Sequence, residues 1–422
     1  MLLQFKVENY KSIKEEAVLS LEASADKEHL ENTIKEGKAN VLKSIAIFGA
    51  NASGKSNLFL ALTAALLTIR ESNLLQVDAP LRHIVPFKFD SKCLASPTAF
   101  ELVFIAGGQK YVYGFSATRA RIMSEYLYVY KSAKPTSVFK RKADEYEFTT
   151  EYIRQFKPVV ERNASNKLFL ATATAWNCEE TKTPLLWLTS GINTYSNDYA
   201  EVLNVTGQMF EYDDDSSLKR FTTAFLHEAD INISDYSLET SESSPAQIQK
   251  AISDGFQGIF SGFPVERMKE YRIKTMHEVD ESGAKTRYSL DFGEESQGTR
   301  SLFLLSPIVK RAFETGEVLF IDEFDASLHP LLVKYIVGLF HDKNINKANA
   351  QLVISSHTTE LLDLNELRRD QVYFMDKDRD TGASQLYSLD EFSERKGSDI
   401  RKAYLLGRYD AVPSIGLGVL EC

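Results

Sequence analysis

The stretch FGANASGKSN combines glycine, lysine and serine in a spacing that suits phosphate binding, because Gly49, Gly54, Lys55 and Ser56 satisfy G-x-x-x-x-G-K-[ST]. The glycines let the backbone curl so that its N–H groups point at phosphate oxygens. Lys55 adds a charge near the β- and γ-phosphates, and the Ser56 hydroxyl can ligate Mg²⁺. The spacing therefore predicts ATP and Mg²⁺ as ligands, bound by Gly49, Asn51, Ala52, Ser53, Gly54, Lys55, Ser56 and Asn57.

A second group of chemistry-bearing residues lies in EVLFIDEFD. Residues 318–321 read as an apolar strand, which places Asp322 at its carboxyl end, where α/β sheets bind ligands. Asp322 can hold Mg²⁺ through water, and Glu323 can polarise the attacking water. A strand ending in Asp-Glu is common alone, but its pairing with a phosphate loop is specific. We predict Glu323 and Lys55 as catalytic residues, and Asp322 with Ser56 as the metal site.

Two histidines follow these motifs. His357 ends the apolar run QLVISSH, where an imidazole can hydrogen-bond a γ-phosphate or the attacking water. A lone histidine after a strand is usually structural, but its order behind Asp322 and Glu323 favours a catalytic role. His329 is interpreted instead as a helix-entry residue, because Pro330 suits the first turn of a helix.

The polar stretch EESQGTRS precedes the apolar run LFLLSPIVKRAF. Ser296 or Thr299 can cap the helix that this run predicts. The same exposed geometry, a hydroxyl and a backbone N–H at a helix start, can also reach a nucleotide held by another molecule. The residues alone leave both interpretations open.

The elements that position these residues indicate an α/β fold. Residues 43–50 predict a buried strand feeding the phosphate loop, followed by a helix from Lys55 to about Arg70. Residues 84–150 are β-rich, with a hairpin turning at Gly107-Gly108. A second hairpin turns at residues 280–283, and helix, strand, helix and strand then alternate as in a helix-covered parallel sheet.

We predict three parts of the chain. Residues 1–150 form an ATPase lobe with the phosphate loop and a β-rich subdomain, residues 151–265 a mostly helical insertion, and residues 266–422 the second ATPase lobe. Length alone also fits one large domain with an insertion.

Composition excludes several classes of protein. The 422 residues are 43% hydrophobic and carry a formal net charge of −10, so nucleic acid would need a local basic patch. Three scattered cysteines form neither a disulfide framework nor a metal cluster. The N-terminus lacks the features of a signal peptide, and the longest apolar region is shorter than the roughly 20 residues that span a bilayer. We expect a cytoplasmic protein without a membrane partner.

The ordered set of motifs resembles the ABC-type ATPases of the SMC and RecF-like branch. It looks most similar to stand-alone ATPases of bacterial phage-defence and abortive-infection operons, relatives of the overcoming-lysogenisation-defect nucleases without the nuclease domain. The segments that carry the resemblance span residues 4–415: FKVENYKSI, GANASGKSN, EESQGTRSL, FIDEFDASLHP, QLVISSHTTELL and YLLGRYDAVPSI.

The resemblance implies an ABC-type P-loop core, a mixed sheet with covering helices, with a β-rich subdomain and a mostly helical insertion. It implies that Ser296 and Gly298 contact the γ-phosphate held by the opposite subunit, and that Asp325 lies at the dimer interface. The chain would then hydrolyse ATP as a homodimer or higher oligomer. Its role would be the sensor or regulatory subunit of an anti-phage defence system, controlling a nuclease or toxin encoded nearby.

Some residues depart from the family pattern. The signature core is Glu-Ser-Gln-Gly instead of the Leu-Ser-Gly-Gly-like sequence of transport-type ATPases. This difference argues against the ATPase of a transporter. Gln109 lies in a hairpin turn, so the metal-sensing glutamine stays unassigned. Asp410 stands where the family pattern has a small residue.

Two other functions stay open. The basic run at residues 131–142 would serve a RecF-like DNA-binding ATPase, with nucleic acid as a partner. Asp376 and Asp378 follow an apolar run, as in a metal-dependent nuclease, although the chain that remains after them is short for such a domain.

Overall fold

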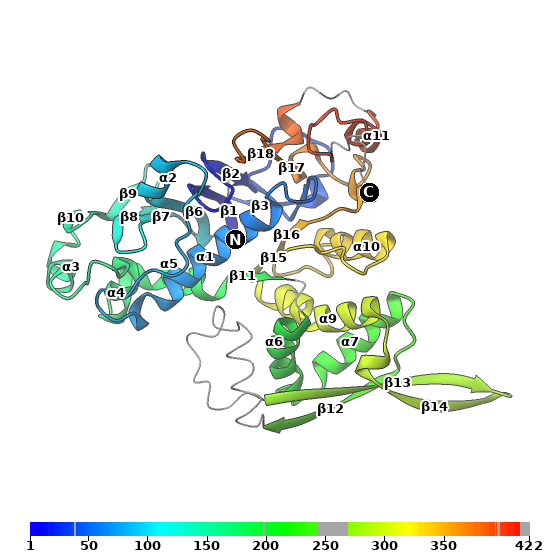
Figure 1. The fold of residues 1–422 in the computed structure, drawn as a ribbon. Helices are drawn as coiled ribbons and strands as arrows, with labels where there is room; N and C mark the ends of the chain where they lie inside the picture. The colour runs from blue at the N-terminus through cyan, green and yellow to red at the C-terminus, as the bar shows by residue number, and fades with distance from the viewer. Residues whose placement is uncertain (38, 197–198, 243–268, 393, 395–396, 414–422) are drawn as a thin grey trace, which may run out of the picture.

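A six-stranded sheet forms the centre of the molecule in the computed structural model, which describes residues 1–37, 39–196, 199–242, 269–392, 394 and 397–413 (Figure 1). Its strands, in spatial order, are β11 (Ile192–Tyr195), β15 (Val318–Ile321), β16 (Gln351–Ser355), β5 (Ser44–Phe48), β17 (Val372–Lys377) and β18 (Ser384–Ser388). All neighbours pair in parallel except β17 and β18. The predicted α/β fold of the ABC type, with a mixed sheet and covering helices, is confirmed.

Both faces of this sheet are covered, which explains why its strands read as continuous apolar runs. In β5, Ile45 and Ile47 pack into one core with α1 (Lys55–Glu71). Ala46 and Phe48 point to the opposite core, which contains α9 (Gln297–Thr315) and α10 (Pro330–His341). The two-residue period of a strand thus divides one sequence run between two hydrophobic cores.

A seven-stranded antiparallel sheet forms the β-rich lobe on the left of Figure 1. The predicted hairpin at Gly107-Gly108 joins β6 (Thr98–Ala106) to β7 (Gln109–Ala117), and both glycines have positive φ, 55° and 74°. In spatial order the strands are β10 (Glu145–Phe148), β9 (Thr136–Lys142), β8 (Ile122–Tyr130), β7 (Gln109–Ala117), β6 (Thr98–Ala106), β1 (Leu2–Glu8) and β2 (Ala17–Ser20). A small separate sheet pairs β3 (Thr33–Glu36) with β4 (Ala39–Leu42).

The segment predicted as a helical insertion is shared between both halves of the molecule. Its helices are α3 (Ile153–Val160), α4 (Phe169–Ala175), α5 (Glu179–Ser190), α6 (Tyr199–Glu211) and α7 (Ser217–Glu228). The first three lie against the β-rich lobe, where Trp187 stacks on Phe104, whereas α6 and α7 lie beside α9 (Figure 1). The sequence pattern did not reveal β11, which pairs with β15 inside the central sheet. Residues 243–265 lie outside the described residues, and the three-part division stays a prediction.

The elements after this segment follow the predicted order. A three-stranded antiparallel sheet contains β12 (Asp235–Glu242), β13 (Lys269–Glu281) and β14 (Ala284–Asp291), and its β13–β14 hairpin extends away from α9 (Figure 1). Helix α9, strand β15, helix α10 and strand β16 then alternate. Short helices α2 (Ser91–Ala95) and α11 (Ile400–Leu405) complete the described α-helices.

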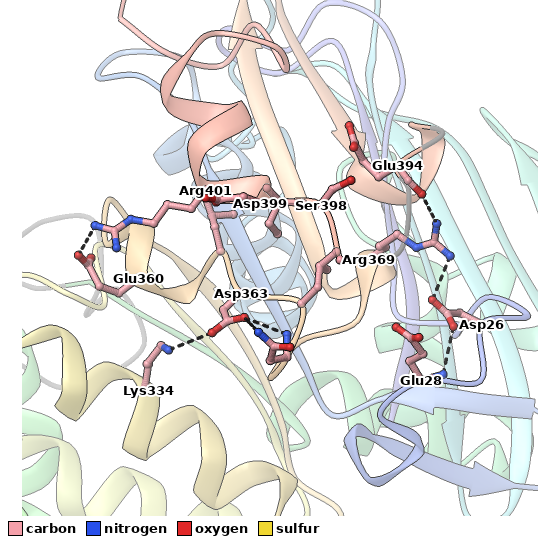
Figure 2. A pocket seen from close by; sticks show the side chains of 15 residues that line it. Asp26, Glu28, Lys334, Glu360, Asp363, Arg369, Glu394, Ser398, Asp399 and Arg401 are labelled. Carbon is pink, nitrogen blue, oxygen red and sulfur yellow. Dashed lines mark hydrogen bonds and ion pairs between the residues drawn. The ribbon is translucent and has the colours of Figure 1, made fainter.

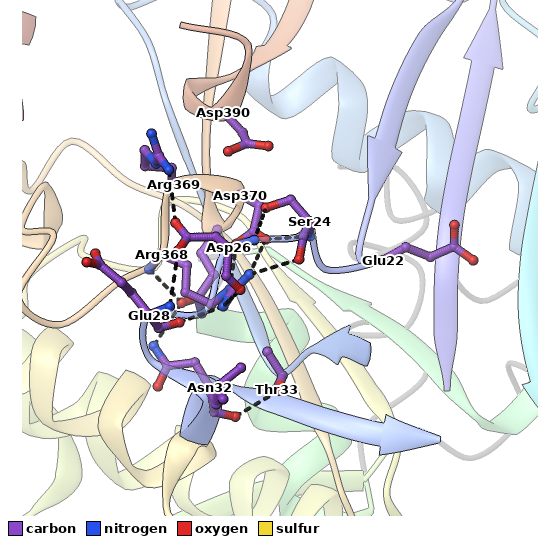
Figure 3. Close-up of polar contacts among 12 residues, drawn as sticks. Glu22, Ser24, Asp26, Glu28, Asn32, Thr33, Arg368, Arg369, Asp370 and Asp390 are labelled. Atoms are coloured by element: carbon purple, nitrogen blue, oxygen red, sulfur yellow. Dashed lines mark hydrogen bonds and ion pairs between the residues drawn. The ribbon is translucent and has the colours of Figure 1, made fainter. Parts of the chain in front are cut away.

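A buried arginine connects the beginning of the chain to the entrance of β17 (Figure 3). The Arg368 side chain is fully buried and donates through Nε and Nη2 to both carboxylate oxygens of Asp370, at 2.8 and 2.7 Å. It also donates to the carbonyl oxygens of Asp26 and Glu28, and Asp370 accepts from the Ser24 amide. A buried ion pair is stable only when its remaining donors and acceptors are satisfied, as they are here. Because Arg368 and Asp370 lie just before β17, this network fixes the start of that strand.

Candidate functional site

Strand order brings the predicted motifs to one edge of the central sheet. Strands β15, β16 and β5 are parallel neighbours, so their carboxyl ends meet at one edge, where α/β sheets bind ligands. A cleft of about 680 Å³ opens there, lined by Asn51, Ala52, Ser53, Gly54, Lys55, Ser56, Asn57, Glu323, Asp325, Ala326, His357 and Lys377. Gly49 and Asp322 lie behind this lining, whereas Ser296 and Gly298 do not belong to it.

The phosphate loop, residues 49–56, has a backbone that depends on its two glycines. Gly54 has φ 111°, and a Cβ there would lie 2.3 Å from the Ser384 hydroxyl oxygen. A Cβ on Gly49 would lie 2.3 Å from the carbonyl oxygen of Met375. Helix α1 begins at Lys55 and no described side chain caps it, so the N–H groups ahead of Asn57, whose amide donates to the Gly54 carbonyl, can bind an anion. The buried Ser53 hydroxyl has no hydrogen-bond partner in the described chain, which fits a loop built for a phosphate.

Two serines far apart in the chain brace this loop. The Ser384 hydroxyl donates to the Ser53 carbonyl oxygen at 2.6 Å and shares a second hydrogen bond, 2.8 Å long, with the Ser12 hydroxyl. Asn57 donates to the same Ser12 oxygen at 2.7 Å. Ser12 belongs to the segment FKVENYKSI, so this part of the sequence supports the nucleotide loop structurally.

The Lys55 ammonium lies over its own loop. It donates to the carbonyl oxygens of Gly49 at 2.8 Å and Ala50 at 3.1 Å. Burial lowers the pKa of Lys55, while Asp322 and the other two carboxylates of the cleft act in the opposite direction. A phosphate in the cleft would add a directly contacting counter-charge to this ammonium, which donates to neutral carbonyl oxygens of the loop.

Asp322 and Glu323 are held by one hydroxyl that the sequence analysis missed. Ser355, the last residue of β16, donates to Asp322 at 2.5 Å and accepts from the Glu323 amide at 2.7 Å. Glu323 has φ 50°, a left-handed backbone that is uncommon for a residue with a long side chain. Such local strain is typical of functional sites, and here it turns the chain sharply after β15.

Asp325 connects the segment after β15 to the segment after β16. Its carboxylate accepts from the His357 amide and the Thr358 hydroxyl, each at 2.8 Å. Burial and the nearby Lys55 lower the pKa of His357 below 6.5, although the cleft carboxylates oppose the shift. His357 is therefore neutral near pH 7 and presents one ring nitrogen as donor and the other as acceptor.

The stretch EESQGTRS contains the start of α9. The Ser296 hydroxyl accepts from the Thr299 amide at 3.1 Å, so Ser296 is the N-cap of α9. A Cβ on Gly298 would lie 2.5 Å from the Ser327 carbonyl oxygen, so this glycine permits close packing within the chain. Capping is thus established, and Ser296 is also exposed at the start of α9. A role toward another subunit remains compatible with both facts.

Three further residues take structural roles. His329 caps α10 by accepting from the Leu331 amide, which confirms it as a helix-entry residue. Asp410 has φ 56°, a conformation that aspartate tolerates better than most residues. Gln109 begins β7 and accepts from the Tyr111 hydroxyl.

The residues that suggested other functions also form structural contacts. Asp378 accepts from the amide and hydroxyl of Thr381 and closes the turn between β17 and β18. In the described ranges, no group of three or more His, Cys, Asp or Glu side chains is placed to hold a metal ion. Arg141, in the basic run, is buried beside Glu125 and donates to the carbonyl oxygens of Lys167 and Ser165.

A second cleft, of about 750 Å³, lies between α10, the start of α11 and the loop at Asp26 (Figure 2). Each of the three cations that line it is paired with a carboxylate. Arg401 pairs with Glu360 at 2.7 Å and Arg369 pairs with Asp26 at 3.2 Å. Its third cation, Lys334, pairs with two carboxylates, those of Asp363 and Glu366. The cations of this cleft are therefore already paired by the protein itself.

Among the described helices, none combines the length and apolar character that crossing a bilayer requires.

Comparisons with known proteins place the chain in a family. A family model described as "AAA domain, putative AbiEii toxin, Type IV TA system" matches residues 44–156 and 198–363, more than half of the chain. No curated protein matches the sequence.

Similar solved structures include an SMC head domain from Thermotoga maritima (14% identity, TM-score 0.41, 92% of this chain and 98% of that one). Another is an SmcHead bound to the C-winged helix domain of ScpA (12%, TM-score 0.44, 92% and 97%). The match of the family model covers both the phosphate loop and the Asp322-Glu323 segment. The chain belongs to this family of AAA-domain ATPases.

Proposed function

We propose that this chain binds and hydrolyses ATP, dimerises around it, and serves as the sensor or regulatory subunit of an anti-phage defence system that controls a partner effector. The observation that carries the proposal is the convergence of Lys55, Asp322, Glu323 and His357 on one cleft edge. The family description, which names a toxin of a type IV TA system, supports the defence role.

Each residue has a defined task in the hydrolysis. Amides of the phosphate loop and Lys55 bind the phosphates and neutralise charge that develops on them. Ser56 and Asp322 would hold Mg²⁺, which supplies further neutralisation of the phosphate oxygens when bound.

Glu323 and His357 would act on the water that attacks the phosphate. Glu323 orients and polarises it, and the hydrogen bond from the Glu323 amide to Ser355 fixes the backbone that carries this carboxylate. Neutral His357 can donate one hydrogen bond to the terminal phosphate.

Dimerisation would complete the site. Within one chain, Ser296 lies outside the cleft lining but is exposed at the start of α9, with its hydroxyl bound only locally. A second subunit could place this helix start against the open side of the nucleotide. Closing and opening of the dimer would then transmit the nucleotide state to the effector.

The substitution Glu323→Gln tests this function. The carboxamide keeps the shape but loses the base, so hydrolysis should slow by at least about 100-fold while ATP binding persists. Size-exclusion chromatography with light scattering should show more dimer with ATP and Mg²⁺ than in the wild type. Glu314→Gln, at the exposed end of α9, is the matched control and should behave as wild type. Unchanged turnover in Glu323→Gln would reject the proposed role of Glu323.

The defence role needs a separate measurement. Cells carrying the native operon should restrict phage, and Lys55→Ala in that operon should abolish the restriction. Protection that persists without a functional phosphate loop would separate the ATPase from defence.

A further inference from the structure

A second lysine reaches the nucleotide cleft from a strand that carries none of the recognised motifs. Lys377 is the last residue of β17 and lines the cleft together with the phosphate loop. Strand β17 lies beside β5 on the side opposite β16 and β15. Lys377 therefore approaches the loop from the flank opposite Asp322 and Glu323.

The register of the β17–β18 hairpin directs this side chain. Lys377 stands directly opposite Ser384 in the antiparallel ladder. Paired residues of a ladder project from the same face of the sheet. The Ser384 hydroxyl reaches the Ser53 carbonyl of the phosphate loop at 2.6 Å, so Lys377 projects toward the same loop.

The backbone around Lys377 is firmly held. The hydrogen bonds from Thr381 to Asp378 close the turn that follows, and Ser384 also bonds to Ser12 through both its amide and its hydroxyl. This support fixes the backbone that carries Lys377, so that only its side chain has to be ordered when it binds a ligand.

The charge of Lys377 is not neutralised by the protein. Within the described part of the chain its ammonium forms no hydrogen bond or ion pair, although its side chain is partly buried. Lys55, in contrast, donates to two carbonyl oxygens. An unpaired ammonium beside free amides at a helix start creates a site for an anion.

We propose that Lys377 is a second phosphate-binding lysine, which contacts the nucleotide held by the phosphate loop of its own chain on the flank opposite the metal site. This inference rests on the proposed nucleotide site. Because the contact lies away from Asp322, it should form with ADP as well as ATP, and in the absence of Mg²⁺.

Nucleotide affinity is the direct test. Isothermal titration of the full chain with ADP in EDTA should show binding at least about tenfold weaker in Lys377→Met than in the wild type, because a charge-assisted hydrogen bond is lost. Lys377→Arg should retain most of the affinity. Lys35→Met, which removes an exposed strand lysine from β3 and makes the same change in net charge, should leave it unchanged.

Each other result has a defined meaning. Equal ADP affinity of Lys377→Met and wild type overturns the inference, as does an equal loss in Lys35→Met, which would indicate a general charge effect. A loss seen with ATP only, under conditions that form dimers, overturns the contact within one chain. Thermal unfolding without nucleotide verifies the fold, and Lys377→Gln replaces the methionine variant if that one fails to fold.

Failure of the proposed function itself looks different. If Lys55→Ala binds ADP as the wild type does, the phosphate loop is not the nucleotide site, whatever Lys377 does. If Lys55→Ala loses binding while Lys377→Met retains it, only the role of Lys377 is wrong.

Discussion

The two clefts of this molecule contain similar charged side chains in opposite states. In the nucleotide cleft, Lys377 has no partner in the described chain and the Ser53 hydroxyl is buried without a hydrogen bond. In the second cleft, Arg369, Arg401 and Lys334 are all paired with carboxylates (Figure 2). The two clefts have similar volumes. They differ because the nucleotide cleft contains unsatisfied polar groups and a strained backbone. Unpaired groups indicate a ligand, and paired groups indicate structure.

The largest expected effect comes from Lys55. Lys55→Ala removes the buried charge that faces the phosphates, so ATP affinity should fall by at least about 100-fold and hydrolysis should disappear. Fluorescent-nucleotide titration and phosphate release measure the two quantities, with Lys35→Ala as the control. Undiminished hydrolysis by a preparation free of contaminating ATPases would contradict the assignment of the cleft.

A smaller effect is expected on the pH dependence of stability, through the buried and hydrogen-bonded His341. His341 accepts from Ser44 at 2.8 Å, and burial, aided by Lys43, lowers its pKa from 6.5 to about 3. Between these two pKa values the unfolded chain binds a proton on His341 and the folded chain does not. The contribution of neutral His341 to the unfolding free energy is therefore complete above pH 6.5 and decreases as pH falls toward 3. Between pH 7 and pH 5 the loss should be about 2 kcal/mol.

Urea unfolding at both pH values measures this loss. His341→Gln has no imidazole to protonate, so its unfolding free energy should depend less steeply on pH than that of the wild type. Equal pH dependence of the two proteins would show that His341 is not held neutral in the folded state.

The smallest effect is expected in the second cleft. Lys334→Met removes partly exposed ion pairs with Asp363 and Glu366, which should change the unfolding free energy by at most about 1 kcal/mol. ADP affinity should stay within about twofold of the wild type, because this cleft is proposed to have no nucleotide. A tenfold loss of affinity would remove the distinction between the two clefts.

Sequence reasoning found the parts of the site that are contiguous in the chain. The phosphate loop, Asp322, Glu323 and His357 each follow the end of a strand, and parallel pairing of these strands brings them together. The predicted strand and helix around the loop were confirmed as β5 and α1 because their apolar runs are long and bounded by glycine.

The missed residues act through pairs that no local pattern encodes. Ser12 and Ser384 are 372 positions apart, yet they share a hydrogen bond beneath the phosphate loop. Lys377 acquires its direction only from the register with Ser384. Strand β11 is four residues long and gains its partner, β15, from the other half of the chain. Such contacts depend on tertiary pairing. A single serine or lysine in the sequence does not indicate which distant residue it will contact.

Each ATP site is proposed to be built by two chains, and mixing two inactive variants tests this most directly. Lys55→Ala cannot hold phosphate, and Ser296→Arg places bulk where the partner's terminal phosphate must fit. In the heterodimer, one site combines both defects, but the other combines an intact phosphate loop with an intact Ser296.

Mass photometry establishes heterodimer formation, and phosphate release with single-site ATP trapping measures the outcome. We expect each variant alone to be nearly inactive and the mixture to recover part of the activity or the trapping. If heterodimers form and neither recovers, Ser296 serves only as the cap of α9 in its own chain, and the shared site is contradicted.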